Sequence, residues 1–137
     1  MNDEELSVLL NEFPEYLRYV YSHIYLPDST PLQNRIAEIL GDNKNRLILQ
    51  AARGTGKSYI AAIYATRRLL RNVDEKILIV SASGPKAIEI ATFVRSLFEQ
   101  VPLLNHIQPG EGDRDSVLSF DVSGSKTSIA PSVAAVG

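Results

Sequence analysis

Apolar side chains recur with the period of an α-helix in five segments of the chain. In the segment that begins at Pro14, for instance, Tyr16, Val20 and Ile24 fall on one face. Proline or threonine stands at several of the segment starts, where both residue types are common in helices. The pattern predicts helices over residues 4–11, 14–24, 31–40, 57–71 and 84–100.

Two runs of consecutive apolar residues predict β-strands over residues 46–50 and 76–80. Unbroken apolar character is typical of parallel strands that helices cover on both faces. Because the helix expected over residues 57–71 lies between the two runs, they are predicted to form a βαβ unit. Residues 117–122 and 127–130 flank a turn-rich tetrapeptide and predict a β-hairpin. A last apolar run follows over residues 132–136.

The segment between the first expected strand and the following helix reads Ala-Ala-Arg-Gly-Thr-Gly-Lys-Ser, from Ala51 to Ser58. It approximates G-x-x-x-x-G-K-[ST], the pattern of a phosphate-binding loop, in the strand–loop–helix context that such a loop requires. Gly54 and Gly56 permit backbone dihedrals closed to other residues, so the N–H groups of the loop can point toward a phosphate. Residues Ala52, Arg53, Gly54, Thr55, Gly56, Lys57 and Ser58 are therefore expected to bind nucleotide.

The two residues that end the loop have distinct expected roles. A helix that begins near Lys57 adds its N-terminal N–H groups and the positive end of its dipole, which favour an anion. The Lys57 ammonium is expected to reach the β- and γ-phosphates, and the Ser58 hydroxyl to bind Mg²⁺. One position departs from the pattern, because its first glycine falls on Ala51. The alternative is an ordinary glycine-rich connection, with Lys57 and Ser58 on a solvated first turn.

Composition narrows the possible classes of protein. The chain has 137 residues, 45% of them hydrophobic and 22% charged, which suits one domain with a core. It has no cysteine, and its two histidines stand without a second ligand at metal-site spacing. The formal net charge of −2 gives no general attraction to nucleic acid, and no apolar stretch approaches the roughly 18 residues that span a bilayer. An intracellular protein is expected.

Hydrolysis by a phosphate-loop ATPase also needs an acidic residue after a second apolar strand, to hold Mg²⁺, and usually a glutamate that activates water. No carboxylate after residue 80 follows a run of four apolar residues. Since the chain stops on an apolar run, we expect it to be the N-terminal part of a longer protein.

The order of motifs resembles the N-terminal ATPase region of bacteriophage terminase large subunits, the DNA-packaging motors of tailed phages. Thr30–Gln33 resembles the glutamine motif of terminases and related helicases, and Gln50–Ser58 resembles the phosphate loop of the family. Val80–Ser83 resembles the segment after the second strand that couples ATP to DNA movement. Residues 117–130 resemble the stretch before the Walker B strand.

The resemblance implies an α/β fold of the P-loop NTPase class, a RecA/helicase-like parallel sheet flanked by helices, incomplete at its C-terminus. It implies a helical lead over residues 1–30 and an ATPase portion over residues 31–137, with ATP and Mg²⁺ as cofactors. Gln33 would read adenine, although a capping box with Thr30 explains it equally well. Arg53 would stabilise charge on the γ-phosphate and act with Lys57 in catalysis; the alternative is a surface arginine.

By the same resemblance, the partners of the complete protein would be double-stranded DNA, the portal and the small terminase subunit. It would form a homo-oligomeric ring in the cytoplasm of the infected bacterial host, with no membrane. Without the Walker B acid and the nuclease domain, the chain is expected to hydrolyse ATP poorly and to lack nuclease activity. Two alternatives remain open: a helicase-type or kinase P-loop enzyme, and a non-enzymatic fragment that binds nucleotide or a partner.

Overall fold

The computed structural model describes residues 1–42 and 44–137. The chain divides into two compact units, Met1–Tyr64 and Ala65–Gly137, and helix α4 (Lys57–Arg71) runs through the boundary. Together the units hold helices and a small mixed sheet, so the α/β class is confirmed. The predicted functional division, a lead over residues 1–30 and an ATPase portion over residues 31–137, stays a prediction.

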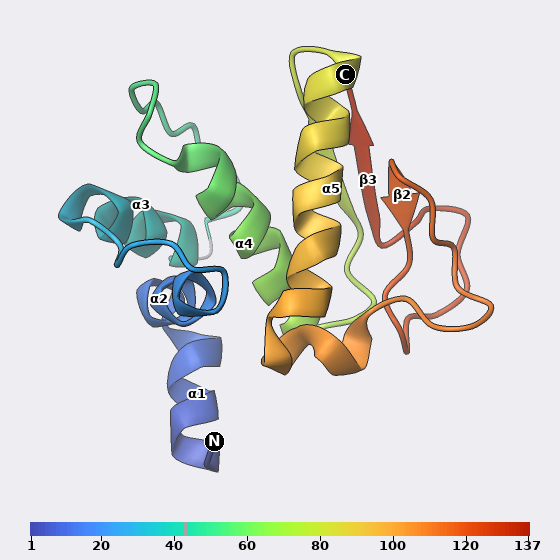
Figure 1. Cartoon of the computed structure of the whole chain (residues 1–137), viewed down its shortest axis with the longest axis horizontal. Helices are drawn as coiled ribbons and strands as arrows, with labels where there is room; N and C mark the ends of the chain where they lie inside the picture. Colours follow the sequence, from blue (N-terminus) through green and yellow to red (C-terminus); the bar gives the residue numbers. More distant parts are fainter. Residues whose placement is uncertain (43) are drawn as a thin grey trace. The chain divides into compact units, whose positions relative to one another are not determined.

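The first unit is helical (Figure 1). Its helices are α1 (Asp3–Asn11), α2 (Phe13–His23), α3 (Pro31–Gly41) and the start of α4. The bounds of the first three lie within one residue of those that the sequence pattern predicts. Capping boxes begin α1 and α3, where Asn2 and Thr30 accept hydrogen bonds from the N–H three residues later. The apolar face of α2 is fully buried, as its helical period indicates: Phe13, Tyr16, Leu17, Val20 and Tyr21.

The strand expected over residues 46–50 is wrong. The structure assigns no strand there, and Ile48 is 90% exposed. A strand needs a neighbour with which to share ladder hydrogen bonds, and hydrophobicity alone does not supply one. The βαβ unit predicted from residues 46–80 is therefore wrong as well. Asn43, in the polar stretch before this segment, lies outside the described residues.

The second unit combines a three-stranded sheet with one long helix. Its elements after α4 are β1 (Ile77–Val80), α5 (Gly84–Gln100), the 3₁₀ helix η1 (Pro102–Ile107), β2 (Ser119–Phe120) and β3 (Val133–Val136). The strand order is β1-β3-β2, with β3 parallel to β1 and antiparallel to β2. Figure 1 shows α5 alongside β3. A parallel pair, β1 and β3, is thus joined by a connection that contains α5.

Helix α5 covers one face of this sheet. Ala87 and Ala91 of α5 form a buried cluster with Ala135 of β3, and Ile79 of β1 packs against it. Small side chains on the helix allow it to approach the strands closely. The alternate residues of β1 are open, with Leu78 63% and Val80 70% exposed. The expectation that helices cover this strand on both faces is therefore wrong for the described part of the chain.

The hairpin expected over residues 117–130 is also wrong. Only Ser119 and Phe120 form a strand, and they pair with Val133 and Ala134 of β3 rather than with residues 127–130. The turn itself is present, because Gly124 has φ +86° and the Ser125 N–H donates to the Val122 carbonyl.

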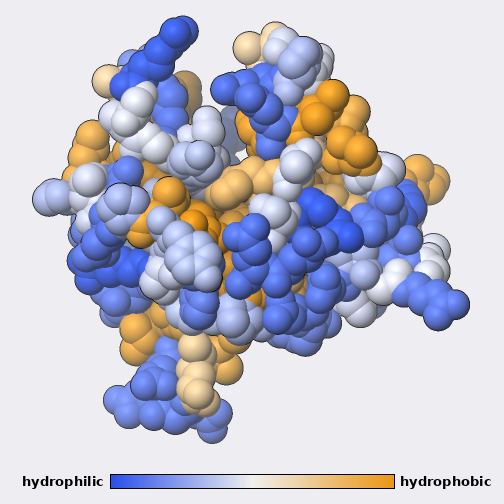
Figure 2. Space-filling view, viewed as in Figure 1, coloured by the Kyte–Doolittle hydropathy of each residue, from blue (hydrophilic) through white to orange (hydrophobic). Residues whose placement is uncertain are grey.

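The surface is mixed in character. Figure 2 shows hydrophilic residues over most of one face, with hydrophobic patches between them. No helix among residues 1–42 and 44–137 is long and apolar enough to span a bilayer.

Candidate phosphate-binding loop

The predicted phosphate loop joins an irregular segment to α4 within the first unit. Gly54 and Gly56 have φ of +82° and +81°, which are the left-handed dihedrals that the sequence predicts for them. The Thr55 hydroxyl donates to the Ala52 carbonyl over 2.9 Å and closes the turn. Helix α4 begins at Lys57, and the Ile60 N–H donates to the Gly56 carbonyl at its first turn.

Lys57 folds back over this loop. Its Nζ atom lies 2.7 Å from the carbonyl oxygen of Ala51, six residues earlier. A carbonyl is a neutral acceptor, and a phosphate oxygen forms a stronger charge-assisted hydrogen bond with an ammonium group. The side chain is therefore already placed at the loop, and a bound phosphate can replace its present partner.

The other polar residues of the loop face solvent. Arg53 lies in its turn and is exposed, and so is Ser58 in the first turn of α4. The guanidinium of Arg53 and the hydroxyl of Ser58 are thus accessible to a ligand. Their expected roles at the γ-phosphate and at Mg²⁺ stay predictions.

Gln33 lies against the loop, although 22 residues separate it from Thr55. Its Nε2 donates to the Thr55 carbonyl over 3.1 Å. Its Oε1 accepts from the Thr30 N–H over 3.0 Å, and the Thr30 hydroxyl accepts from the Gln33 N–H over 3.2 Å. The capping box is confirmed. The structure also brings Gln33 to the phosphate loop, while reading of adenine stays a prediction.

Tyr21 is the neighbour of the loop that the sequence pattern does not reveal. Its hydroxyl lies 3.8 Å from the position that a Cβ on Gly56 would occupy. Burial raises the pKa of the Tyr21 phenol, and the nearby Tyr59 raises it further. Helical spacing places Tyr21 on the apolar face of α2 with several core residues, and nothing in that spacing distinguishes it from them.

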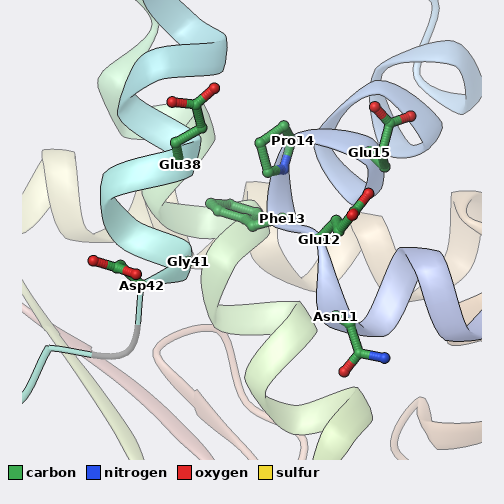
Figure 3. Close-up of a pocket in the computed structure, with 8 residues that line it drawn as sticks. All are labelled: Asn11, Glu12, Phe13, Pro14, Glu15, Glu38, Gly41 and Asp42. Atoms are coloured by element: carbon green, nitrogen blue, oxygen red, sulfur yellow. The ribbon is translucent and has the colours of Figure 1, made fainter.

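A cavity of about 390 Å³ lies elsewhere in the first unit, where α1, α2 and the end of α3 meet. Its lining includes four carboxylate side chains and the ring of Phe13, which Figure 3 draws as sticks. Its described lining contains no residue of the loop: Asn11, Glu12, Phe13, Pro14, Glu15, Glu38, Gly41 and Asp42. An acidic lining is unsuited to a polyphosphate, because like charges repel.

The loop itself suits a polyphosphate. Nothing lies within 4 Å of the position that a Cβ on Gly54 would occupy, so the backbone there is open to a ligand. The N–H groups in the first turn of any α-helix have no carbonyl partner within the helix, and here that turn begins at Lys57. In the described part of the chain, no three His, Cys, Asp or Glu side chains gather to hold a metal ion.

Comparison with known proteins identifies a relative. The chain is 40% identical over 134 residues, 96% of its length, to the large subunit of terminase from Enterobacteria phage T3. The resemblance to phage terminase large subunits is confirmed. This terminase-like chain spans 23% of the length of that relative, so the activity and partners of a whole terminase are proposals for it. No protein-family model matches the chain.

Proposed function

We propose that the chain binds ATP with Mg²⁺ and is the nucleotide-binding part of a viral DNA-packaging motor. The observation that carries this proposal is the position of Lys57, whose ammonium lies 2.7 Å from a loop carbonyl at the start of α4. Two glycines with positive φ precede it. The terminase relative supports the packaging role. In the complete protein, ATP hydrolysis would drive translocation of double-stranded DNA.

Each residue of the loop has its own binding role in this proposal. Backbone N–H groups of residues 52–56 bind phosphate oxygens, and Lys57 binds the β- and γ-phosphates. Ser58 binds Mg²⁺ through its hydroxyl, while Arg53 offsets charge that develops on the γ-phosphate. Gln33 is the candidate for reading adenine. The finer fold proposed for the complete domain is a P-loop NTPase with a RecA/helicase-like sheet.

The partners of the complete motor follow from the terminase resemblance. We propose double-stranded DNA, the portal and the small terminase subunit as partners, with a homo-oligomeric ring as the assembled state. The expected location is the cytoplasm of the infected bacterial host. A helicase-type P-loop ATPase and a non-enzymatic nucleotide-binding fragment are the alternatives.

The phosphate-loop assignment is tested by ligand-induced stabilisation. ATP with Mg²⁺ at about 100 times its dissociation constant contributes about 2.7 kcal/mol and raises the melting temperature by several degrees. Lys57→Ala is expected to abolish this rise, because it removes the charge at the β- and γ-phosphates. The rise is measured for each variant against its own melting temperature without ATP.

Lys86→Ala is the matched control for this test. Lys86 is exposed on α5 and forms an ion pair with Glu89, so its removal deletes one positive charge outside the loop. This variant is expected to keep the full rise with ATP. An equal rise in the wild type and in Lys57→Ala would contradict phosphate binding by the loop.

A further inference from the structure

Two helices approach the phosphate loop at one glycine. A Cβ on Gly56 would lie 2.9 Å from Gln33 Nε2 of α3 and 3.8 Å from the Tyr21 hydroxyl of α2. The first distance is shorter than real Cβ contacts, so only glycine fits this position without displacing Gln33. Side chains of α2 and α3 therefore both lie close to the loop backbone at Gly56.

The amide of Gln33 already has a partner at each end. Its oxygen accepts from the Thr30 N–H at the start of α3, and its nitrogen donates to the Thr55 carbonyl in the loop. Reading a base edge requires the donor and acceptor of an amide to face that base. Here one donor and one lone pair of the amide are directed at backbone groups and hold the loop, and one of each remains.

The hydrogen bond to Thr55 also sets the direction of the next N–H group. The peptide unit between Thr55 and Gly56 is planar and trans, so its C=O and N–H point in opposite directions. Because Gln33 holds the Thr55 carbonyl, the Gly56 N–H points away from α3. In a glycine-rich phosphate loop, such N–H groups are the donors to the phosphate.

We propose that Gln33 is a positioning residue for the phosphate loop, with Tyr21 beside it at Gly56. Gln33 fixes the peptide between Thr55 and Gly56, and the buried Tyr21 packs beneath Gly56. This assigns a function to α2, which belongs to the helical lead. The proposal rests on phosphate binding by the loop, and it requires that loss of Gln33 weakens binding of every polyphosphate ligand, with or without a base.

The test uses Gln33→Met in the full chain of 137 residues, with Mg²⁺ and three probes: ATP, GTP and tripolyphosphate. Methionine has a similar length but neither a donor nor an acceptor of comparable strength. Loss of one hydrogen bond is expected to weaken binding of all three probes by about fivefold. A loss confined to ATP would overturn the proposal, because it would show that Gln33 reads adenine. Unchanged binding of all three probes would overturn it too.

Thr30→Ala is the matched control for helix capping. It removes the hydroxyl that caps α3 but keeps the Thr30 N–H that Gln33 Oε1 accepts from. The variant is expected to have a lower melting temperature, like Gln33→Met, with tripolyphosphate binding within twofold of the wild type. An equal fivefold loss in Thr30→Ala would assign the effect to the cap of α3 and overturn the proposal.

A second measurement does not depend on any ligand. The ¹⁵N order parameter of the Gly56 amide is expected to fall in Gln33→Met, while that of Gly54 changes little, since Gln33 does not lie within 4 Å of the position that a Cβ on Gly54 would occupy. Gln33→Glu serves as a second variant here, because it keeps the oxygen that caps α3 and loses the donor. An unchanged Gly56 order parameter in both variants would overturn the proposal. If the wild type bound no probe, the proposed function would fail, and the order parameters would still decide whether Gln33 positions the loop.

Discussion

Gly54 and Gly56 have nearly the same backbone dihedral but different surroundings. Their φ values are +82° and +81°, a region in which a residue with a Cβ is strained by about 1–2 kcal/mol. Only at Gly56 does an added Cβ also meet a neighbouring side chain, the amide of Gln33. The two positions therefore separate the effect of dihedral strain from the effect of crowding.

We predict that Gly56→Ala destabilises the chain by about 1 kcal/mol more than Gly54→Ala does. Both substitutions introduce the strain of a positive φ, whereas Gly56→Ala also displaces Gln33 and breaks a hydrogen bond that contributes about 1 kcal/mol. Urea unfolding of the two variants, followed by circular dichroism, gives the difference directly. Equal losses of stability would mean that Gln33 moves aside freely.

At the same scale, the sequence predicts which residues form the loop but not all of those that hold it. Gly54, Gly56 and Lys57 are recognised because their types and spacing match a phosphate loop, and the structure has the expected dihedrals. Gln33 stands out through both its motif and its capping box. Tyr21 does not, because a core tyrosine and a tyrosine under a loop have the same helical spacing.

At the scale of elements, one arginine organises the segment before β3. The Arg114 guanidinium donates to both oxygens of Asp121, over 2.9 Å from Nε and 3.2 Å from Nη2. It also donates to the carbonyls of Ser128, Ile129 and Ala130. In a hairpin, alternate carbonyls of residues 127–130 would accept ladder hydrogen bonds, whereas here three consecutive carbonyls accept from Arg114.

We predict that Asp121→Asn lowers the melting temperature at pH 7 by about 3–5 °C, as expected for a loss near 1 kcal/mol at a partly exposed site. Burial raises the pKa of the Asp121 carboxyl, but hydrogen bonds from Arg114 and from the Ser132 N–H outweigh it, so the pKa is lowered overall. A lowered pKa in the folded state stabilises the fold above the ordinary aspartate pKa. This stabilisation is lost as the pH falls below 3.8, the ordinary pKa of aspartate, and through the lowered pKa of Asp121 in the folded state.

Thermal melts of both proteins from pH 7 down to pH 2 check this prediction. The difference in melting temperature is expected to be constant above about pH 5 and to shrink in more acidic solution. Glu111→Gln in the nearby exposed turn is the control, and it is expected to melt like the wild type. A difference that persists unchanged at pH 2 would show that the Asp121 charge is not its cause.

Helices and strands differ in how far the sequence predicts them. All five α-helices are predicted closely, because their caps and apolar periods are local properties. A strand depends on a partner that is distant in the sequence. Ile77–Val80 pairs with β3, whereas residues 46–50, which also contain consecutive apolar residues, form no strand. Hydrophobic runs alone cannot distinguish these two cases.

At the scale of the whole molecule, the loop and the sheet belong to different compact units. The phosphate loop, Gln33 and Tyr21 lie in Met1–Tyr64, and the sheet lies in Ala65–Gly137. Local patterns predict the content of each unit, and the joint spacing of the motifs predicts the terminase resemblance.

We predict that the 137-residue chain binds ATP but turns it over at least a hundredfold more slowly than the roughly 1–100 s⁻¹ of typical kinases. Hydrolysis needs a residue that orients the attacking water and an acid that helps to hold Mg²⁺. No carboxylate after residue 80 follows a run of four apolar residues, which is where that acid is expected. Phosphate release with excess ATP and Mg²⁺ measures the rate, and Lys57→Ala defines the background.

A longer chain that covers the remaining length of the terminase relative is expected to hydrolyse ATP at a rate well above this background. A robust rate in the 137-residue chain, abolished by substituting one of its own carboxylates, would contradict the prediction.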